Sequence, residues 1–468
     1  MRIILALPRN SVNRHYAVLP SLGLGYLLAV LKQKGFSTDE MEYVDCIRDN
    51  ISPSQFSSLI RDKKPDVVGF QVYTPAITST ANYIKAVKDV SPKTITVVGG
   101  PHISALPEDI LYAGADYGFV GEAEVGFPKF LFSLERGFCP TDIDGLVYRI
   151  DDNKKIKKNR QSYIENLDSI PDVLWDKINP QLYPVQPNGI FSAKKRIAPV
   201  ITTRGCPYQC VFCAAPYNSG KKIRKRSPTR VVQEIVLLKE KFGIEEIHFM
   251  DDNITFYKDH IIDICKKIIE EKINIVWSVP NGIRLDRIDE EMLGWMEESG
   301  CYSIAVGIES ASQRVLNLMK KNISIEEVEN KINLIKTKSK IRISGLFIIG
   351  FPGETEQEIK KTIEFSRSIH IDRANFFNFT PFPGSPIFNI LINNNVNIDR
   401  KSFDNFYLHS VEWEYPGIGK NKMRYLQIIS HIKFYMRIKI IIGIIKEIKS
   451  LNQIVVIFRR IKAILTGR

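Results

Sequence analysis

Three cysteines, Cys206, Cys210 and Cys213, are spaced C-x3-C-x2-C in the stretch TTRGCPYQCVFCAAP. A structural zinc site normally has four ligands, and a disulfide framework uses an even number of cysteines. Three thiolates can hold a metal and leave one coordination position vacant. The spacing therefore indicates a reactive metal centre more than a structural one.

The composition is that of an ordinary globular protein. With 468 residues, 44% of them hydrophobic, the chain can form two or three domains with full-sized cores. The start, MRIILALPRN, is a poor signal peptide and a good buried strand, so we expect a cytoplasmic protein. Four further cysteines are scattered singly, and we expect them to be buried small hydrophobic side chains: Cys46, Cys139, Cys265 and Cys301.

The first 140 residues alternate between short apolar runs and helical patterns. This alternation predicts a doubly wound parallel sheet, in which ligands bind beyond the carboxyl ends of the strands. No G-x-G-x-x-G follows the first run, which argues against a nicotinamide or flavin site. The predicted strands are 2–7, 67–73, 94–98 and 117–120, and the predicted helices are 22–34, 77–90 and 106–113.

The rest of the chain divides into three parts. Residues 141–198 indicate a linker with a small β excursion near GLVYRI. Residues 199–390 contain six strand–helix units, which predict an open (β/α)6 barrel with functional residues at the strand ends. Residues 391–468 form an extension that is basic and helical from about 423. The predicted barrel strands are 199–203, 245–250, 275–279, 302–307, 342–348 and 373–379, and the helices are 228–242, 258–271, 289–299, 312–319, 325–338 and 355–369.

The segment TTRGCPYQCVFCA resembles the cluster loop of the radical S-adenosylmethionine superfamily. The resemblance implies that Cys206, Cys210 and Cys213 each bind one iron of a 4Fe–4S cluster. The fourth iron would take the amino and carboxylate groups of S-adenosylmethionine. The alternative, a partial zinc knuckle, lacks a nearby His or Cys to complete it.

The same resemblance assigns further contacts to S-adenosylmethionine. Phe212, directly before the third cysteine, is expected to lie against the adenine. Asp251 and Asp252, in IHFMDDN, are candidates for the methionine amino group. Gly345 and Gly350, in GLFIIGFPGET, are expected to pack beside the adenine.

Three polar residues follow other predicted strands of the barrel. Asn281 and Arg284 stand in PNGIR, and Glu309 stands in VGIES. We expect all three to face the ribose and the carboxylate of S-adenosylmethionine. Arg284 could pair with that carboxylate through two hydrogen bonds.

The N-terminal half resembles the cobalamin-binding domain that precedes the barrel in one radical S-adenosylmethionine subclass. The matching segments are LPSLGLGYLLAVLKQKGF, VVGGPHISALPEDIL, DYGFVGEAEVGFPKFL and DIDGLVYR. None of the histidines lies in the D-x-H-x-x-G motif that ligates cobalt in mutases, so the lower cobalt ligand is left unassigned. We expect His102 to line the groove or its turn and not to bind cobalt. The other expected cobalamin contacts are Leu22, Gly23, Thr74, Thr78, Gly99, Gly100, Gly121 and Glu122.

Together the resemblances imply a cobalamin-dependent radical enzyme. Reductive cleavage of S-adenosylmethionine would give a 5′-deoxyadenosyl radical that acts on an unactivated carbon, most simply for methyl transfer to a lipid or natural product. A reductant such as flavodoxin or ferredoxin would be a partner. The alternatives are ring closure or rearrangement without methyl transfer, as in the anaerobic cyclase, a tRNA methylthiotransferase, or a non-catalytic cobalamin or metal carrier.

The net charge of +13 is concentrated at the C-terminus. Residues 420–468 carry 12 Lys or Arg and a single acid, Glu447, so the main body is nearly neutral and we expect no nucleic-acid partner. Residues 434–465 are apolar but interrupted by basic residues, which argues against a spanning helix. Two alternatives stand: amphipathic helices on an anionic membrane surface, or helices packed under the open barrel with a basic face in water.

Overall fold

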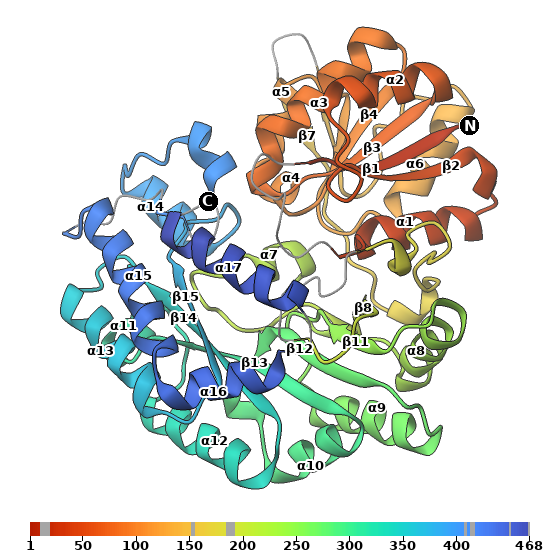
Figure 1. Cartoon of the computed structure of the whole chain (residues 1–468). Coiled ribbons are helices and arrows are strands. Elements are labelled where there is room, and N and C mark those ends of the chain that lie inside the picture. The colour runs from red at the N-terminus through yellow and green to blue at the C-terminus, as the bar shows by residue number, and fades with distance from the viewer. Residues whose placement is uncertain are drawn as a thin grey trace.

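The computed structural model describes residues 1–9, 19–150, 155–183, 192–406, 410–411, 417–448 and 451–466. In this part of the chain two sheets are each flanked by helices, and a helical segment follows the second sheet (Figure 1). The predicted α/β class, with a doubly wound sheet, an open barrel and a helical C-terminal extension, is confirmed.

The first sheet has the strand order β2-β1-β3-β4-β5-β6-β7, parallel through β5 and antiparallel beyond it. Both of its faces are buried: Leu5 of β1 shares a core cluster with Leu28 of α1, and Ile4 shares a second cluster with Phe56 of α2. The strands are β1 (Ile3–Leu7), β2 (Met41–Asp45), β3 (Val67–Gln71), β4 (Ile95–Gly99), β5 (Tyr117–Phe119), β6 (Leu146–Arg149) and β7 (Ile156–Lys158). The helices are α1 (Leu22–Gln33), α2 (Pro53–Lys63), α3 (Ile77–Val90), α4 (Pro101–Ala105), α5 (Pro107–Tyr112) and α6 (Gly126–Glu135).

Three features of this half differ from the sequence-based expectation. Strand β2 was not predicted, because its sequence MEYVD carries two acids and does not form an apolar run. The β excursion near GLVYRI is the β6–β7 hairpin, which continues the first sheet. Cys139 is exposed, so the prediction that it is buried was wrong.

The second sheet is parallel throughout, with the order β8-β11-β12-β13-β14-β15. Its first and last strands lie at opposite edges, which is the open barrel that the sequence predicts. The strands are β8 (Ile197–Val200), β11 (Glu246–Phe249), β12 (Val276–Ile283), β13 (Cys301–Glu309), β14 (Arg342–Ile349) and β15 (Arg373–Asn378). The helices are α8 (Pro228–Phe242), α9 (Lys258–Glu270), α10 (Glu290–Glu298), α11 (Gln313–Leu318), α12 (Ile325–Lys338) and α13 (Glu356–Ser368).

Of the C-terminal helices, α15 covers the edge of the barrel at β15. The C-terminal helices are α14 (Pro386–Asn393), α15 (Lys420–Tyr435), α16 (Ile438–Glu447) and α17 (Leu451–Thr466). The Tyr435 hydroxyl donates to the Ala374 carbonyl at 2.9 Å and accepts from its N–H at 3.4 Å, and Gln427 Nε2 donates to the Phe376 carbonyl at 3.4 Å. Side chains of α15 thereby satisfy backbone groups of the edge strand β15. Among the described residues, no helix is both long and apolar enough to cross a bilayer.

This edge contact makes a prediction about stability. Tyr435→Phe removes the hydroxyl and leaves two backbone groups of Ala374 without it, so we expect the free energy of unfolding to fall by about 1–2 kcal/mol. Tyr425→Phe, on the same helix but exposed, is the matched control and should change it by less than about 0.5 kcal/mol. Denaturant unfolding measures both, and equal effects would contradict the proposed role of the hydroxyl.

Candidate functional site

The three cysteines lie in a loop between β9 (Thr203–Arg204) and α7 (Ala215–Ser219). Gly205 has φ +98°, and a Cβ there would lie 2.3 Å from the Lys222 carbonyl oxygen, so this turn requires glycine. The Cys206 N–H donates to the Gly220 carbonyl at 3.1 Å, and the Val211 N–H to the Met319 carbonyl at 3.0 Å. The loop is therefore hydrogen-bonded at two points. One is Gly220, which precedes β10 (Arg224–Lys225), and the other is Met319, at the end of α11.

The cysteines fit the role of cluster ligands. Cys206, Cys210 and Cys213 are free and partly exposed. Among the described residues, no three His, Cys, Asp or Glu side chains converge on a position for a single metal ion, and this includes the three thiols. Burial raises the pKa of all three thiols, that of Cys213 to about 12, and a bound metal would favour their thiolate forms.

Arg284 lies beside the cysteine loop. Its guanidinium carbon is 3.7 Å from the centroid of the Tyr208 ring, and its Nη1 is 4.0 Å from Cys210 Sγ. Its Nε donates to Asp286 Oδ1 at 2.9 Å. The sequence predicts that Arg284 pairs with the carboxylate of S-adenosylmethionine. In the structure its guanidinium group pairs with Asp286 and lies next to Cys210.

Glu309 forms a buried ion pair that the sequence analysis missed. Its Oε1 lies 2.7 Å from Lys321 Nζ, and both side chains are buried. Glu309 has φ +65°, and a Cβ on Gly307 would lie 2.5 Å from its carboxylate, so the backbone is shaped around the pair. Lys321 Nζ also lies 6.0 Å from the centroid of Phe212, which is partly buried against the core. The only sequence signal for Lys321 was a common Lys-Lys pair.

The two aspartates of IHFMDDN lie in different environments. Asp251 is fully buried and accepts hydrogen bonds from four donor groups, the N–H and hydroxyl of Thr202 and of Thr203, which join the ends of β11 and β8. Burial raises the pKa of Asp251 to about 6. Asp252 instead lines the large cavity described below, whose walls desolvate its carboxylate and raise its pKa. Asn281 also lines the cavity, and its Nδ2 donates to the Met250 carbonyl at 3.0 Å.

The glycine segment after β14 is organised by a carboxyl group. Glu354 Oε2 accepts from the N–H groups of Gly350 at 2.7 Å and Phe351 at 3.1 Å, and Gly350 has φ +77°. Burial raises the pKa of Glu354 to about 8. Gly345 lies on the face of β14 that packs into the core, where a Cβ would meet Ile371 at 2.9 Å. The structure therefore brings Gly350, but not Gly345, to a strand end.

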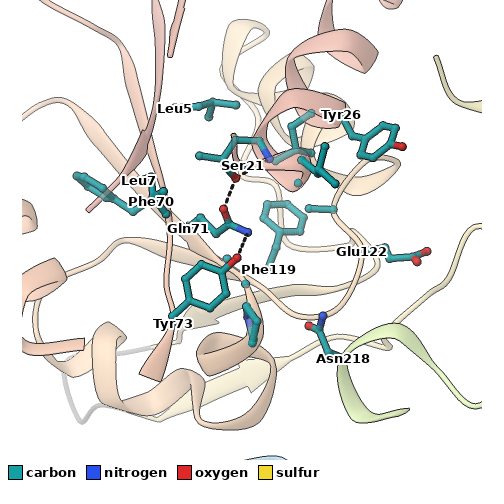
Figure 2. A pocket seen from close by; sticks show the side chains of 18 of the residues that line it. Leu5, Leu7, Ser21, Tyr26, Phe70, Gln71, Tyr73, Phe119, Glu122 and Asn218 are labelled. Carbon is teal, nitrogen blue, oxygen red and sulfur yellow. Dashed lines mark hydrogen bonds between the residues drawn. The ribbon is translucent and has the colours of Figure 1, made fainter. Parts of the chain in front are cut away.

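A cavity of about 860 Å³ opens between the carboxyl ends of the two sheets (Figure 2). Its walls are mainly apolar. From the first sheet, the lining includes the predicted cobalamin residues Leu22, Gly23, Gly99, Gly100, Gly121 and Glu122. From the barrel side it includes Thr203, Arg204, Asn218, Asp252 and Asn281.

Three predicted cobalamin residues do not line this cavity. His102 is fully buried, with Nδ1 3.2 Å from Thr74 Oγ1 and Nε2 3.3 Å from Asp109 Oδ2. Thr78 is exposed, and its N–H donates to Asp404 Oδ1 at 3.3 Å. His102 therefore belongs to the turn after β4, where its N–H donates to the Val72 carbonyl at 3.2 Å, and its buried ring does not line the cavity.

One wall of the cavity carries a polar chain that the sequence analysis did not identify. Ser21 Oγ donates to Gln71 Oε1, and Gln71 Nε2 donates to the Tyr73 hydroxyl at 3.3 Å (Figure 2). Beside it, Gly100 has φ +103°, and a Cβ there would lie 2.9 Å from the Val72 carbonyl oxygen. Side-chain-free backbone, apolar walls and a few hydrogen-bonding groups fit a large flat cofactor such as cobalamin.

Ion pairs join the two domains at the edge of the cavity. Arg224 donates to both carboxylate oxygens of Glu122, at 2.7 and 2.8 Å, and Arg204 lies 2.8 Å from Glu124. All four side chains are largely buried. Glu122 was expected to contact cobalamin. It lines the cavity, and it also binds Arg224 of β10, the strand that pairs with β9 beside the cysteine loop.

We expect this contact to stabilise the protein strongly. Glu122→Gln replaces a carboxylate that takes a bidentate pair and should lower the free energy of unfolding by about 2–4 kcal/mol. Glu165→Gln is the matched control, because Glu165 pairs with Lys222 at the surface, where the side chains are 70% and 74% exposed. Glu165→Gln should change the free energy of unfolding little, and a similar loss in both variants would show that the Glu122 pair is no stronger than a surface pair.

Glu354 makes a prediction about pH. Its folded-state pKa of about 8 lies above the ordinary value of 4.5 for a glutamate side chain, so the folded protein keeps a proton that the unfolded chain releases. Stability from this group is therefore full below about pH 4.5 and is lost as the pH rises through about 8. Glu354→Gln keeps an oxygen acceptor without the charge, so its unfolding free energy relative to wild type should rise across this range, by on the order of 2 kcal/mol. A pH-independent difference between the two proteins would contradict this.

Two family models match the chain: one described as the Radical SAM superfamily over residues 200–366, and one described as the B12 binding domain over residues 12–131. An uncharacterized methyltransferase of Pyrococcus horikoshii is 32% identical over 406 residues, which are 85% of this chain and 84% of that protein. The anaerobic magnesium-protoporphyrin IX monomethyl ester cyclase of Rubrivivax gelatinosus is 28% identical, over 79% of this chain and 66% of the cyclase.

The fold is also found among solved structures. The radical S-adenosylmethionine methyltransferase TsrM of Kitasatospora setae aligns with a TM-score of 0.71 and 17% identity, over 84% of this chain and 76% of that one. At this identity the likeness concerns the fold alone. Because both family models match in the order of the two sheets and a relative at 32% identity spans most of both chains, this protein belongs to the radical S-adenosylmethionine superfamily, in the subclass with an N-terminal cobalamin-binding domain, and its cofactors are a 4Fe–4S cluster, S-adenosylmethionine and cobalamin.

Proposed function

We propose that the protein is a C-methyltransferase that delivers a methyl group from methylcobalamin to an unactivated carbon of a lipid or natural-product substrate. The observation that carries the proposal is the single cavity that both domains line. Gly99 and Gly100 at the end of β4 share it with Asp252 and Asn281 from the barrel. The Pyrococcus relative matches this chain over most of its length and is described as a methyltransferase, which supports the same reaction class.

The bound cofactors supply the difficult chemistry: a reduced cluster with S-adenosylmethionine yields a 5′-deoxyadenosyl radical, and methylcobalamin carries the methyl group. The protein's own residues hold and orient them. The three cysteines are the iron ligands, and Arg284 beside Cys210 offsets the negative charge of that thiolate. The carboxylate of Asp252 is open to the cavity and can accept N–H hydrogens from the ammonium group of the methionine moiety.

The apolar walls of the cavity serve a second purpose. Leu5, Leu7, Phe70 and Phe119 line it, and such walls exclude water from reactive species (Figure 2). A low-potential reductant protein, such as flavodoxin or ferredoxin, would supply the electrons. One alternative remains open on the same scaffold. Ring closure without methyl transfer is favoured by the likeness to the Rubrivivax cyclase.

The cysteine assignment is tested by iron content. Cys210→Ser should reduce the iron of the anaerobically reconstituted protein from about four per chain to below one, and should abolish formation of 5′-deoxyadenosine from S-adenosylmethionine and a reductant. Cys139→Ser, at the exposed cysteine outside the loop, is the control and should keep both. A wild-type protein that binds four irons yet never forms 5′-deoxyadenosine would rule out the enzyme and leave a carrier.

Methyl transfer is separated from ring closure by the fate of S-adenosylmethionine. A methyltransferase should convert reduced cobalamin and S-adenosylmethionine to methylcobalamin and S-adenosylhomocysteine, even without the final substrate. Chromatography of the reaction, with and without cobalamin, measures this. Formation of 5′-deoxyadenosine with no cobalamin-dependent S-adenosylhomocysteine would support ring closure instead.

A further inference from the structure

Helix α16 exposes a stripe of isoleucines to solvent. Ile438, Ile441, Ile442 and Ile445 recur at spacings of three and four, which places them on one face of the helix. Ile438 is 76% exposed and Ile445 is 61% exposed. The opposite face is already used, because Ile440 is buried in the core. The outer part of the stripe, above all Ile438 and Ile445, therefore lies in solvent and not in the core.

Helix α17 repeats this arrangement. Val455, Phe458, Ile461 and Leu465 are exposed and again recur at spacings of three and four, and Phe458 is 67% exposed. Gln453, near the start of the helix, is buried. We call the two exposed stripes of α16 and α17 the tail surface; both helices belong to the dark blue end of the chain in Figure 1. Contiguous exposed apolar residues of this kind mark an interaction site.

The segment that carries the tail surface is rich in basic residues. Residues 420–468 carry 12 Lys or Arg and one acid, Glu447. The structure turns that acid inward: Glu447 Oε2 lies 2.6 Å from Arg342 Nη1 and 2.8 Å from Arg373 Nη2, at the starts of β14 and β15. Its charge is thus compensated within the protein. Exposed Lys439 and Lys446 border the isoleucine stripe of α16.

We propose that the tail surface docks on an anionic lipid bilayer. Apolar stripes bordered by basic residues are the pattern of helices that lie in the membrane interface, where the apolar side chains enter the acyl boundary and the lysines stay with anionic headgroups. A second copy of the chain would match this surface less well, because it brings the same positive charge. The docking is peripheral, since no described helix could span a bilayer.

Vesicle flotation tests the proposal with the full chain carrying its reconstituted cluster. We expect it to float with vesicles of phosphatidylglycerol and phosphatidylcholine, to float much less with phosphatidylcholine alone, and to dissociate as the salt concentration rises. Lys439→Gln with Lys446→Gln should lower the partition coefficient roughly 25-fold, at about fivefold for each charge removed. Absence of binding to anionic vesicles, or equal binding to both vesicle types, would overturn the proposal.

The apolar stripes are tested by a second pair of variants. Ile438→Ser with Phe458→Ser should lower the partition coefficient at least about tenfold. Leu237→Ser with Ile390→Ser removes two exposed apolar side chains from α8 and α14, outside the tail surface, and should leave binding unchanged. Thermal melts of both variants confirm that each is folded. Equal binding by both variants would overturn the proposal, as would a wild-type chain that self-associates without vesicles and loses only that association in the tail-surface variant.

Discussion

The bidentate pair between Glu122 and Arg224 is the contact on which the site depends, because it holds the carboxyl ends of two separate sheets face to face. Each domain on its own would present only half of a cavity. Glu124 and Arg204 repeat the pairing next to the cysteine loop. Placing both acids in one domain and both arginines in the other leaves each domain with a buried charge that only the other neutralises. Such pairs specify one arrangement of the domains, since separating them would expose or strand the charges.

The cysteine loop is held by contacts over a shorter range. Gly205 lets the chain turn sharply after β9, and backbone hydrogen bonds tie the loop to Gly220 and Met319. Around it, Arg284 and the Glu309–Lys321 pair fix charges close to Cys210. Burial raises the pKa of all three thiols.

Buried carboxyl groups near the strand ends serve structure as often as chemistry. The carboxylate of Asp251 is hydrogen-bonded to Thr202 and Thr203, whereas its neighbour Asp252 lines the cavity. Glu354 folds the segment that begins at Gly350 in a similar way. Because adjacent residues at a strand end point in opposite directions, the sequence pair DD could not say which carboxylate would be available. The same limit applied to His102, which the turn into α4 buries.

The sequence alone predicted the fold class and the order of the two domains, both of which are confirmed, and it identified Cys206, Cys210 and Cys213 as the candidate cluster ligands. Apolar periodicity and a strictly spaced motif are local signals, and they survive without knowledge of distant contacts. Tertiary structure decided which side chains share the cavity, why Glu122 pairs with Arg224, and which face of the terminal helices stays exposed. Those outcomes depend on residues separated by a hundred or more positions, and their relative placement exists only once the two sheets have packed. Gln71, Lys321 and Arg224 were not predicted either, because each is an ordinary polar side chain until the fold gives it a partner.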